Sequence, residues 1–150
     1  GPIPETEFGK EMIKRIDADP RVIRTGLVQG QELAELFSNC RLFVLPSHTE
    51  GLSLALLEAM SCGGRCLVSD IPANTVITGQ YGAEFEAETR DSLAAALSKE
   101  LTTPKDEELL KQEMEYVKEN FDYDAVIEWH EDVYKCALNR KNEKRWEQNC

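Results

Sequence analysis

The chain has 150 residues, which is enough for one globular domain with a hydrophobic core. Its 28 acidic residues exceed its 17 basic residues and give a formal net charge of −11, so little would neutralise the phosphates of a nucleic acid. No apolar run approaches the roughly 20 residues of a membrane span, and no signal peptide is visible. We expect a single soluble domain that binds no nucleic acid.

The cysteines favour a reducing compartment over a disulfide framework. Their number, five, is odd, and no set of cysteines and histidines has the spacing of a zinc site. Cys62 and Cys66 flank the Gly63-Gly64 turn and adjoin apolar segments, which indicates small core residues. We therefore expect a cytoplasmic protein without a metal site.

The first 39 residues alternate between helical and strand-like patterns. Apolar residues at helical spacing predict a helix over residues 5–17, which Pro20 ends. An alternating pattern predicts a strand over residues 21–25, and a turn at Gly26–Gly30 leads into a predicted helix over residues 31–39. The side chains of that helix expected to face a sheet are Leu33, Leu36 and Phe37.

The middle of the chain predicts a βαβ unit. Residues 42–45 are four apolar residues that stop at Pro46, which is typical of a strand buried on both faces. A polar turn then leads into an apolar run ended by Gly63-Gly64, as expected of a helix, and residues 65–69 are strand-like again. The two strands of such a unit lie parallel in one sheet.

The remaining residues are mainly helical in pattern. Predicted elements are a short helix over 73–78 with Pro72 near its start, a weak strand over 83–86, a helix over 92–101 with Asp91 as N-cap, a helix over 104–120, a helix over 123–138 and a polar, frayed tail over 139–150. Predicted strands and helices alternate in the first part of the chain, and helices dominate the last part. This order predicts an α/β fold with a Rossmann-like, mostly parallel sheet flanked by helices.

Two carboxylates stand out in the βαβ unit. Glu58 is the only charged residue in the apolar run 52–60, and a buried carboxylate needs a partner or a ligand. Helical side chains lean toward the N-terminus, which aims Glu58 at the turn that carries Glu50. A purely structural interpretation is also open, in which Glu50 is a first-turn acid that interacts favourably with the helix dipole and Glu58 pairs with Arg41 or Arg65.

The turn before the predicted helix favours an anion. The backbone N–H groups of Gly51, Leu52 and Ser53 are expected to open that helix, where the helix dipole stabilises negative charge. Ligands of open α/β sheets bind outside the carboxyl ends of the strands, which is where this turn lies. The pattern therefore suggests a phosphate at the helix end with carboxylates that hold hydroxyls beside it.

The order and spacing of these residues carry a family resemblance. Pro46-Ser47, Glu50-Gly51-Leu52 and Glu58-Ala59-Met60, with seven residues between the glutamates, resemble the signature of glycosyltransferase family 4, the group 1 glycosyl transferases of GT-B architecture. The similarity extends over roughly residues 20–85. It departs at Arg65, where members commonly have a proline, and at Val76, where many have a glutamate.

The resemblance implies roles for individual residues. Glu50 matches the glutamate that holds donor-sugar hydroxyls and faces the reacting carbon, and Glu58 matches the one that accepts hydrogen bonds from the ribose hydroxyls. The other implied donor-binding residues offer backbone N–H groups to the diphosphate (Gly51, Leu52 and Ser53) or border the base (Gly26, Leu27 and Val28).

The implied function is a retaining glycosyltransferase that moves a sugar from a UDP- or GDP-sugar to a hydroxyl acceptor without a metal or other cofactor. Polysaccharide or glycolipid biosynthesis is the expected setting. Residues 1–150 match the C-terminal, nucleotide-sugar-binding domain, and family members carry further strands and an N-terminal acceptor domain ahead of it. The arginine and lysine that members use on the diphosphate belong to that preceding segment, so this chain alone is expected to be inactive.

The alternative is a non-catalytic α/β interaction or regulatory domain of the same fold. Membrane association, at the cytoplasmic face, is expected only of a full-length protein, because these 150 residues carry an acidic excess and no basic patch.

Overall fold

The computed structural model describes residues 5–147, apart from the side chains of residue 125 and residues 139–147. These residues form seven helices and three strands. They fall into two compact units, Gly1–Leu36 and Phe37–Cys150, which we describe separately.

The first unit contains helix α1 (Glu7–Ala18), which begins as its side chains dictate. The hydroxyl of Thr6 accepts a hydrogen bond from the backbone N–H of Gly9 at 3.0 Å and so caps the helix. The predicted strand over residues 21–25 is not formed. Instead, the guanidinium groups of Arg21 and Arg24 pair with Asp19 and Asp17, each at 2.7 Å. A strand needs a neighbour to pair with, and this segment pairs with no strand among the described residues.

Helix α2 (Gly30–Asn39) crosses the division between the units. Phe37 is buried, as predicted, and its ring lies edge-on to that of Phe43 with 5.3 Å between centroids. The prediction was wrong for Leu36, whose side chain is 48% exposed. A helix face is buried over only part of its circumference, and Leu36 falls outside that part.

The second unit is built on a parallel sheet, which confirms the predicted fold class. Strands β1 (Phe43–Leu45), β2 (Cys66–Ser69) and β3 (Ala83–Phe85) lie in the order β1-β2-β3. Every residue of β2 is buried, whereas the three residues of β1 are only half-buried. The expectation that β1 is buried on both faces was therefore wrong, because β1 lies at an edge of the sheet formed by the described residues.

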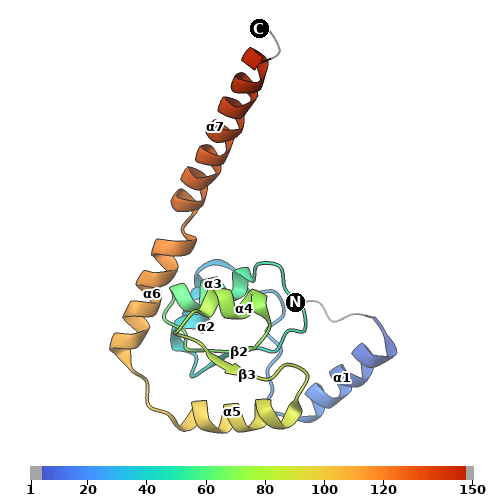
Figure 1. Ribbon diagram of the computed structural model, residues 1–150. Helices are drawn as coiled ribbons and strands as arrows, with labels where there is room; N and C mark the ends of the chain where they lie inside the picture. Colours follow the sequence, from blue (N-terminus) through green and yellow to red (C-terminus); the bar gives the residue numbers. More distant parts are fainter. Residues whose placement is uncertain (1–4, 148–150) are drawn as a thin grey trace. The chain divides into compact units, whose positions relative to one another are not determined.

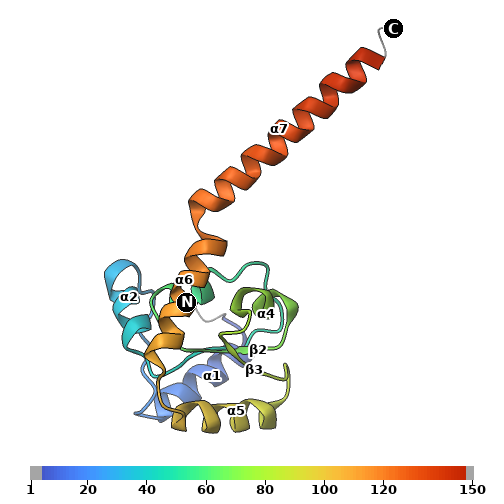
Figure 2. The ribbon, with the colours of Figure 1, turned by 60° about the vertical axis from the view of Figure 1, so that its left-hand side comes forward.

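Helices cover both faces of this sheet (Figure 1). Helix α3 (Leu54–Ser61) and helix α4 (Pro72–Thr78) lie together on one face, and α5 (Arg90–Thr102) lies on the other, which Figure 2 shows for α4 and α5 from a second side. The fully buried apolar side chains of this layered core are Leu56, Ala59, Met60, Cys66, Leu67, Val68 and Ile77. Cys66 is thus a core residue as predicted, while Cys62 is only half-buried.

The glycine pair between α3 and β2 is required by close backbone packing. Gly63 has a φ of +71°, a conformation that other residues rarely adopt. A Cβ atom at Gly64 would lie 2.9 Å from the carbonyl oxygen of Ala59 and 3.0 Å from that of Phe37. The turn therefore ends α3 and brings the chain back into the sheet with no room for a side chain.

The later helices begin and end at positions that differ from the prediction. Helix α5 begins after Thr89 rather than after Asp91, which lies in its first turn. Helix α6 (Glu107–Phe121) begins after Asp106, whose carboxylate accepts hydrogen bonds from two backbone N–H groups at 3.1 Å. The carboxylate cap, and not the proline at position 104, fixes this start.

Helix α7 (Tyr123–Glu147) continues past the predicted end at residue 138. The predicted frayed tail was therefore wrong for residues 139–147, and residues 148–150 lie outside the described part. The segment contains several lysines, arginines and glutamates and no proline or glycine, so nothing in it ends a helix. None of the helices in the described residues is long and apolar enough to cross a membrane.

Arg65 joins the start of β2 to the end of α5. Its guanidinium donates to the carboxylate of Glu100 and to the backbone carbonyls of Glu100 at 3.1 Å and Thr103 at 3.0 Å. The two side chains are 19% and 6% exposed. Arg41 donates to the carbonyls of Leu101 and Thr103, each at 2.8 Å. The last carbonyls of α5, which have no partner within the helix, are thereby satisfied.

Candidate functional site

The candidate site lies where β1 and β2 end. The loop of residues 46–53 follows β1 and leads into α3, and Asp70 follows β2. Both strands run parallel, so these two connections meet at the carboxyl edge of the sheet. This is the edge at which open α/β sheets bind their ligands.

Glu50 is held in this loop by a neighbouring side chain. The carboxylate is half-buried, and its Oε1 atom accepts a hydrogen bond from the hydroxyl of Ser47 at 2.7 Å. The first turn of α3 contains no acid, so the interpretation of Glu50 as a first-turn residue that answers the helix dipole is wrong. Glu50 instead carries a fixed charge on the loop that precedes the helix.

Helix α3 begins later than predicted. Ser53 is its N-cap: the hydroxyl of Ser53 accepts from the N–H of Leu56 at 3.4 Å. Gly51, Leu52 and Ser53 therefore precede the helix rather than open it, and the helix begins with Leu54. Gly51 is exposed, with no atom within 4 Å of where a Cβ would lie, and Leu52 is 58% exposed. The loop before α3 is thus open to an approaching ligand.

Glu58 is exposed, contrary to the prediction of a buried carboxylate. Helix α3 is apolar nearly all round, yet one side of it faces solvent, because Leu54 is 60% exposed and Leu57 is half-buried. The carboxylate of Glu58 forms no ion pair with the described residues. Arg41 and Arg65, its possible structural partners in the sequence, bind the end of α5 instead.

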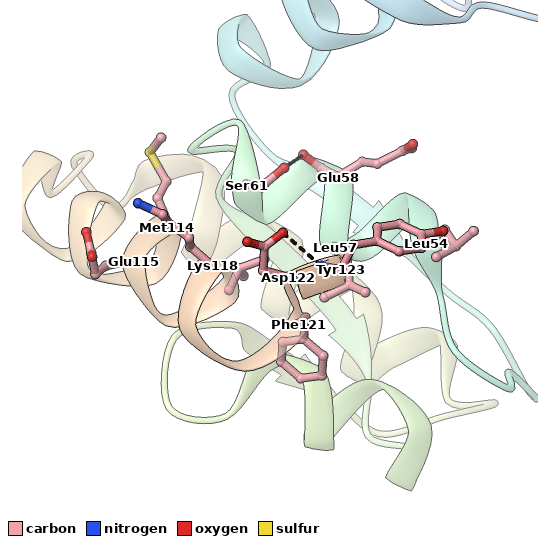
Figure 3. A pocket seen from close by; sticks show the side chains of 11 residues that line it. Leu54, Leu57, Glu58, Ser61, Met114, Glu115, Lys118, Phe121, Asp122 and Tyr123 are labelled. Carbon is pink, nitrogen blue, oxygen red and sulfur yellow. Dashed lines mark hydrogen bonds between the residues drawn. The ribbon is translucent and has the colours of Figure 1, made fainter. Parts of the chain in front are cut away.

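The side of α3 that carries Glu58 borders a cavity. Its volume is about 690 Å³, and α6 and the start of α7 form the opposite wall. Figure 3 shows the side chain of Glu58 extending away from Phe121, so its carboxylate lies at the rim. Apolar lining residues include Leu57 and Phe121, and polar ones include Lys118 and Asp122. An exposed, unpaired carboxylate on a rigid helix is suited to accept hydrogen bonds from ligand hydroxyls.

A chain of buried and partly buried hydrogen bonds supports the loop that carries Glu50. The side-chain amide of Asn74 donates to the hydroxyl of Ser69 at 3.0 Å, and that hydroxyl donates to the carbonyl of Ser47 at 2.5 Å. Ser47 in turn donates to Glu50. Asn74 and Ser69 are 0% and 1% exposed. The sequence interpretation missed both residues, although a serine directly at the end of a buried strand was a usable signal.

Three of the predicted donor-binding residues lie in the first unit. Gly26 has a φ of +71°, as expected of a turn that only glycine adopts readily. Leu27 is 78% exposed, and Val28 is half-buried. Their role in bordering a base stays a prediction.

Comparison with known proteins places this chain in a family. A family model described as "Glycosyl transferases group 1" matches residues 1–103. The chain belongs to the group 1 glycosyl transferases. The match covers α2, the sheet and the glutamate loop, and it confirms the resemblance carried by the two glutamates.

Several enzymes resemble this group 1 glycosyl transferase in sequence. The serotype-specific mannosyltransferase WbdA of Escherichia coli is 35% identical over 82 residues, which are 55% of this chain and 10% of WbdA. The alpha-galactosylglucosyldiacylglycerol synthase of Streptococcus pneumoniae is 28% identical over 138 residues, which are 89% of this chain and 36% of the synthase. The chain therefore spans about a tenth to a third of the length of these relatives.

The fold of this group 1 glycosyl transferase is also found in a solved structure. Sucrose-phosphate synthase from Thermosynechococcus elongatus superposes with a TM-score of 0.75 at 22% identity. The similarity covers 87% of this chain and 34% of the synthase. The predicted GT-B type of fold is thereby confirmed for this chain.

The hydrogen-bond chain behind Glu50 predicts a measurable loss of stability. The Ser69→Ala variant of this group 1 glycosyl transferase leaves the Ser47 carbonyl without its donor and the Asn74 amide with only the backbone carbonyl of Ser69, at 3.3 Å, so we expect the free energy of unfolding to fall by about 1–3 kcal/mol. Urea denaturation measures this. The exposed Ser98, which donates to its own helix, is the control, and Ser98→Ala should change stability by less than about 0.5 kcal/mol. Equal effects would contradict the prediction.

No group of three or more metal-ligating side chains comes together within the described residues. The candidate site consists of two carboxylates, one capped helix start and an open loop. Such a site can bind a ligand that carries hydroxyls and a negatively charged group.

Proposed function

We propose that this chain is the donor-binding part of a retaining glycosyltransferase that transfers a sugar from a UDP- or GDP-sugar to a hydroxyl acceptor. The observation that carries the proposal is the pair of glutamates. One is fixed by Ser47 on the open loop at the carboxyl edge of the sheet, and the other is unpaired and exposed on the helix that follows. Family membership and the named activities of the relatives support the same reaction class.

Each site residue then has a physical task. Glu50 binds hydroxyls of the donor sugar next to the reacting carbon, and Glu58 binds the ribose hydroxyls. The backbone N–H groups of Gly51, Leu52 and Ser53 bind the diphosphate, which leaves with its negative charge stabilised. Gly26, Leu27 and Val28 border the base. Hydrogen bonds from hydroxyls to carboxylates are stronger than bonds between neutral groups, which suits two glutamates to a sugar nucleotide.

The transfer itself is proposed to need a larger protein. The chain spans about a tenth of the mannosyltransferase relative, and the acceptor domain of the family would stand ahead of the first residue. We infer that the isolated chain binds a nucleotide-sugar weakly and turns none over, and that it uses no metal or other cofactor. Polysaccharide or glycolipid biosynthesis is the proposed setting, in keeping with the diacylglycerol product named for the Streptococcus pneumoniae relative. The cytoplasmic face of the membrane is the proposed location.

Calorimetric titration of UDP- and GDP-sugars tests the proposal. We expect heat of binding with one of them and an affinity about tenfold to a hundredfold lower in Glu58→Ala, because the variant loses hydrogen bonds from two ribose hydroxyls to a charged acceptor. Glu119, an exposed acid on α6, is the matched control. Binding in wild type that Glu58→Ala leaves unchanged would overturn the assigned role of Glu58. The absence of binding to any sugar nucleotide would instead favour a non-catalytic interaction domain.

A further inference from the structure

A buried acid lies far along the chain from the two site glutamates. Glu113 of α6 is 2% exposed, and its Oε1 atom has no hydrogen-bond partner among the described residues. Buried polar atoms are nearly always bonded, so an orphaned carboxyl oxygen needs an explanation. Burial raises the pKa of Glu113 to about 7. Near neutral pH this group therefore exists both as a carboxylate, which accepts hydrogen bonds, and as a carboxylic acid, which can also donate one.

The side chains of Arg65 and Cys66 direct their hydrogen bonds to groups other than Glu113. The guanidinium of Arg65 is bonded to the carboxylate of Glu100 and to two backbone carbonyls. The thiol of Cys66 donates to the carbonyl of Gly64 at 3.0 Å. Neither side chain donates to the Oε1 atom of Glu113. The Oε1 atom of Glu113 is therefore left free to accept a hydrogen bond from a bound molecule.

There is room for such a donor. Glu113 lines a cavity of about 720 Å³, within the size range of small-molecule sites. The first residues of two strands, Cys66 of β2 and Ala83 of β3, also line it. These are the amino ends of parallel strands, whereas Glu50 follows the carboxyl end of β1. The cavity lies at the amino ends of the parallel strands, and the candidate donor site lies at their carboxyl ends.

The charges around the cavity point to a neutral ligand. Lys99 and Lys105 line it together with Asp106 and Glu107, so a cation and an anion would each meet groups of like charge. Lys99 is 3.8 Å from Glu100 with a side chain that is 79% exposed, and the Asp106 carboxylate accepts two backbone N–H groups. A neutral molecule with several hydroxyls can donate to Glu113 and accept from the lysines without a net charge.

We propose that the cavity between α5, α6 and the amino edge of the sheet binds a neutral polyhydroxyl ligand of one or two sugar rings, with a ligand hydroxyl donating to Glu113. Tyr81, which also lines the cavity, offers an aromatic ring for stacking against a sugar ring. This site is independent of the proposed donor site and would be occupied whether or not a sugar nucleotide binds.

Titration with maltose, followed by two-dimensional amide NMR of the chain, tests the proposal. Maltose is expected to shift the amide signals of Cys66, Ala83 and Glu113, while n-butylammonium and butyrate at the same concentration leave them in place. Glu113→Leu removes the acceptor and should weaken maltose binding at least about tenfold. Glu108→Leu removes an exposed acid of α6 that does not line the cavity, and its affinity should stay within twofold of wild type.

Three results would overturn the proposal. Maltose could leave the amides of the cavity wall unshifted, the charged probes could shift them equally, or Glu113→Leu could bind maltose as tightly as wild type. Amide dispersion in the spectrum of each variant shows whether it is folded. Should Glu113→Leu fail to fold, Glu113→Gln replaces it. The glutamine side chain keeps an acceptor oxygen, so maltose is expected to shift the same backbone amide signals of the cavity wall. The absence of these shifts would also overturn the proposal.

Discussion

The Arg65→Met variant is expected to lower the free energy of unfolding by about 3–5 kcal/mol. Removal of the guanidinium leaves the carboxylate of Glu100, which is 6% exposed, as a buried charge whose remaining cationic neighbour is the exposed Lys99 ammonium at 3.8 Å. It also leaves the carbonyls of Glu100 and Thr103 without one of their donors. Methionine keeps most of the length and apolar surface of the arginine stem, so lost packing contributes little. Urea denaturation of wild type and variant at pH 7 measures the difference.

Two further variants separate the buried charge from other effects. Arg65→Met combined with Glu100→Met removes both charges and should recover most of the lost stability, because two apolar side chains replace the pair. Arg41→Met removes an exposed guanidinium that donates to carbonyls at the same helix end, where water can take its place, so a loss below about 1 kcal/mol is expected. The explanation fails if Arg41→Met and Arg65→Met are equally destabilising.

Glu113→Gln is expected to stabilise the fold at pH 8 by about 2–3 kcal/mol and to change its stability little at pH 5. Burial raises the pKa of Glu113 from 4.5 to about 7. The folded state therefore holds this proton more tightly than the unfolded state does. The resulting stabilisation is complete below pH 4.5 and is lost as the pH rises through 7. Glutamine cannot ionise, so the variant escapes this loss.

The measurement is the difference in unfolding free energy between wild type and variant at pH 5, 6, 7 and 8. This difference isolates Glu113 from the other acids, which titrate in both proteins. Glu108→Gln, at an exposed position of the same helix, should show no comparable trend with pH. A constant difference across the four pH values would mean that Glu113 ionises in the folded protein as it does in the unfolded chain.

The βαβ unit was predictable because its signals are local. An apolar run that stops at Pro46, an apolar helix and a glycine pair each specify one element by their own sequence. The structure places β1, α3 and β2 where these signals lie and pairs the strands in parallel. The outcome for residues 21–25, where the predicted strand is not formed, could not be inferred in the same way. An alternating pattern shows that a segment can form a strand, whereas the partner that decides the outcome lies elsewhere in the chain.

The candidate site was predicted in part for the same reason. The spacing of Glu50 and Glu58 identifies the family from sequence alone, and the family match confirms it. The exposure of Glu58 was not predictable, because an apolar helix shows no polar side from which to infer which residues face solvent. The contacts of Ser69 and Asn74 with the glutamate loop also depend on tertiary structure. Ser69 donates to a carbonyl 22 positions away, and no local pattern encodes that distance.

The burial of Cys66 has a practical consequence for the study of this chain. Burial and the nearby carboxyl of Glu113 raise the pKa of the Cys66 thiol, and its side chain is 1% exposed in the middle strand of the sheet. An alkylating reagent reacts with thiolates in contact with solvent, and among the described cysteines Cys136 is exposed. Cys136 is therefore labelled while the chain is folded, whereas labelling of Cys66 reports how often the sheet opens. The rate at which Cys66 is labelled is therefore a measure of the rate of spontaneous opening of the sheet.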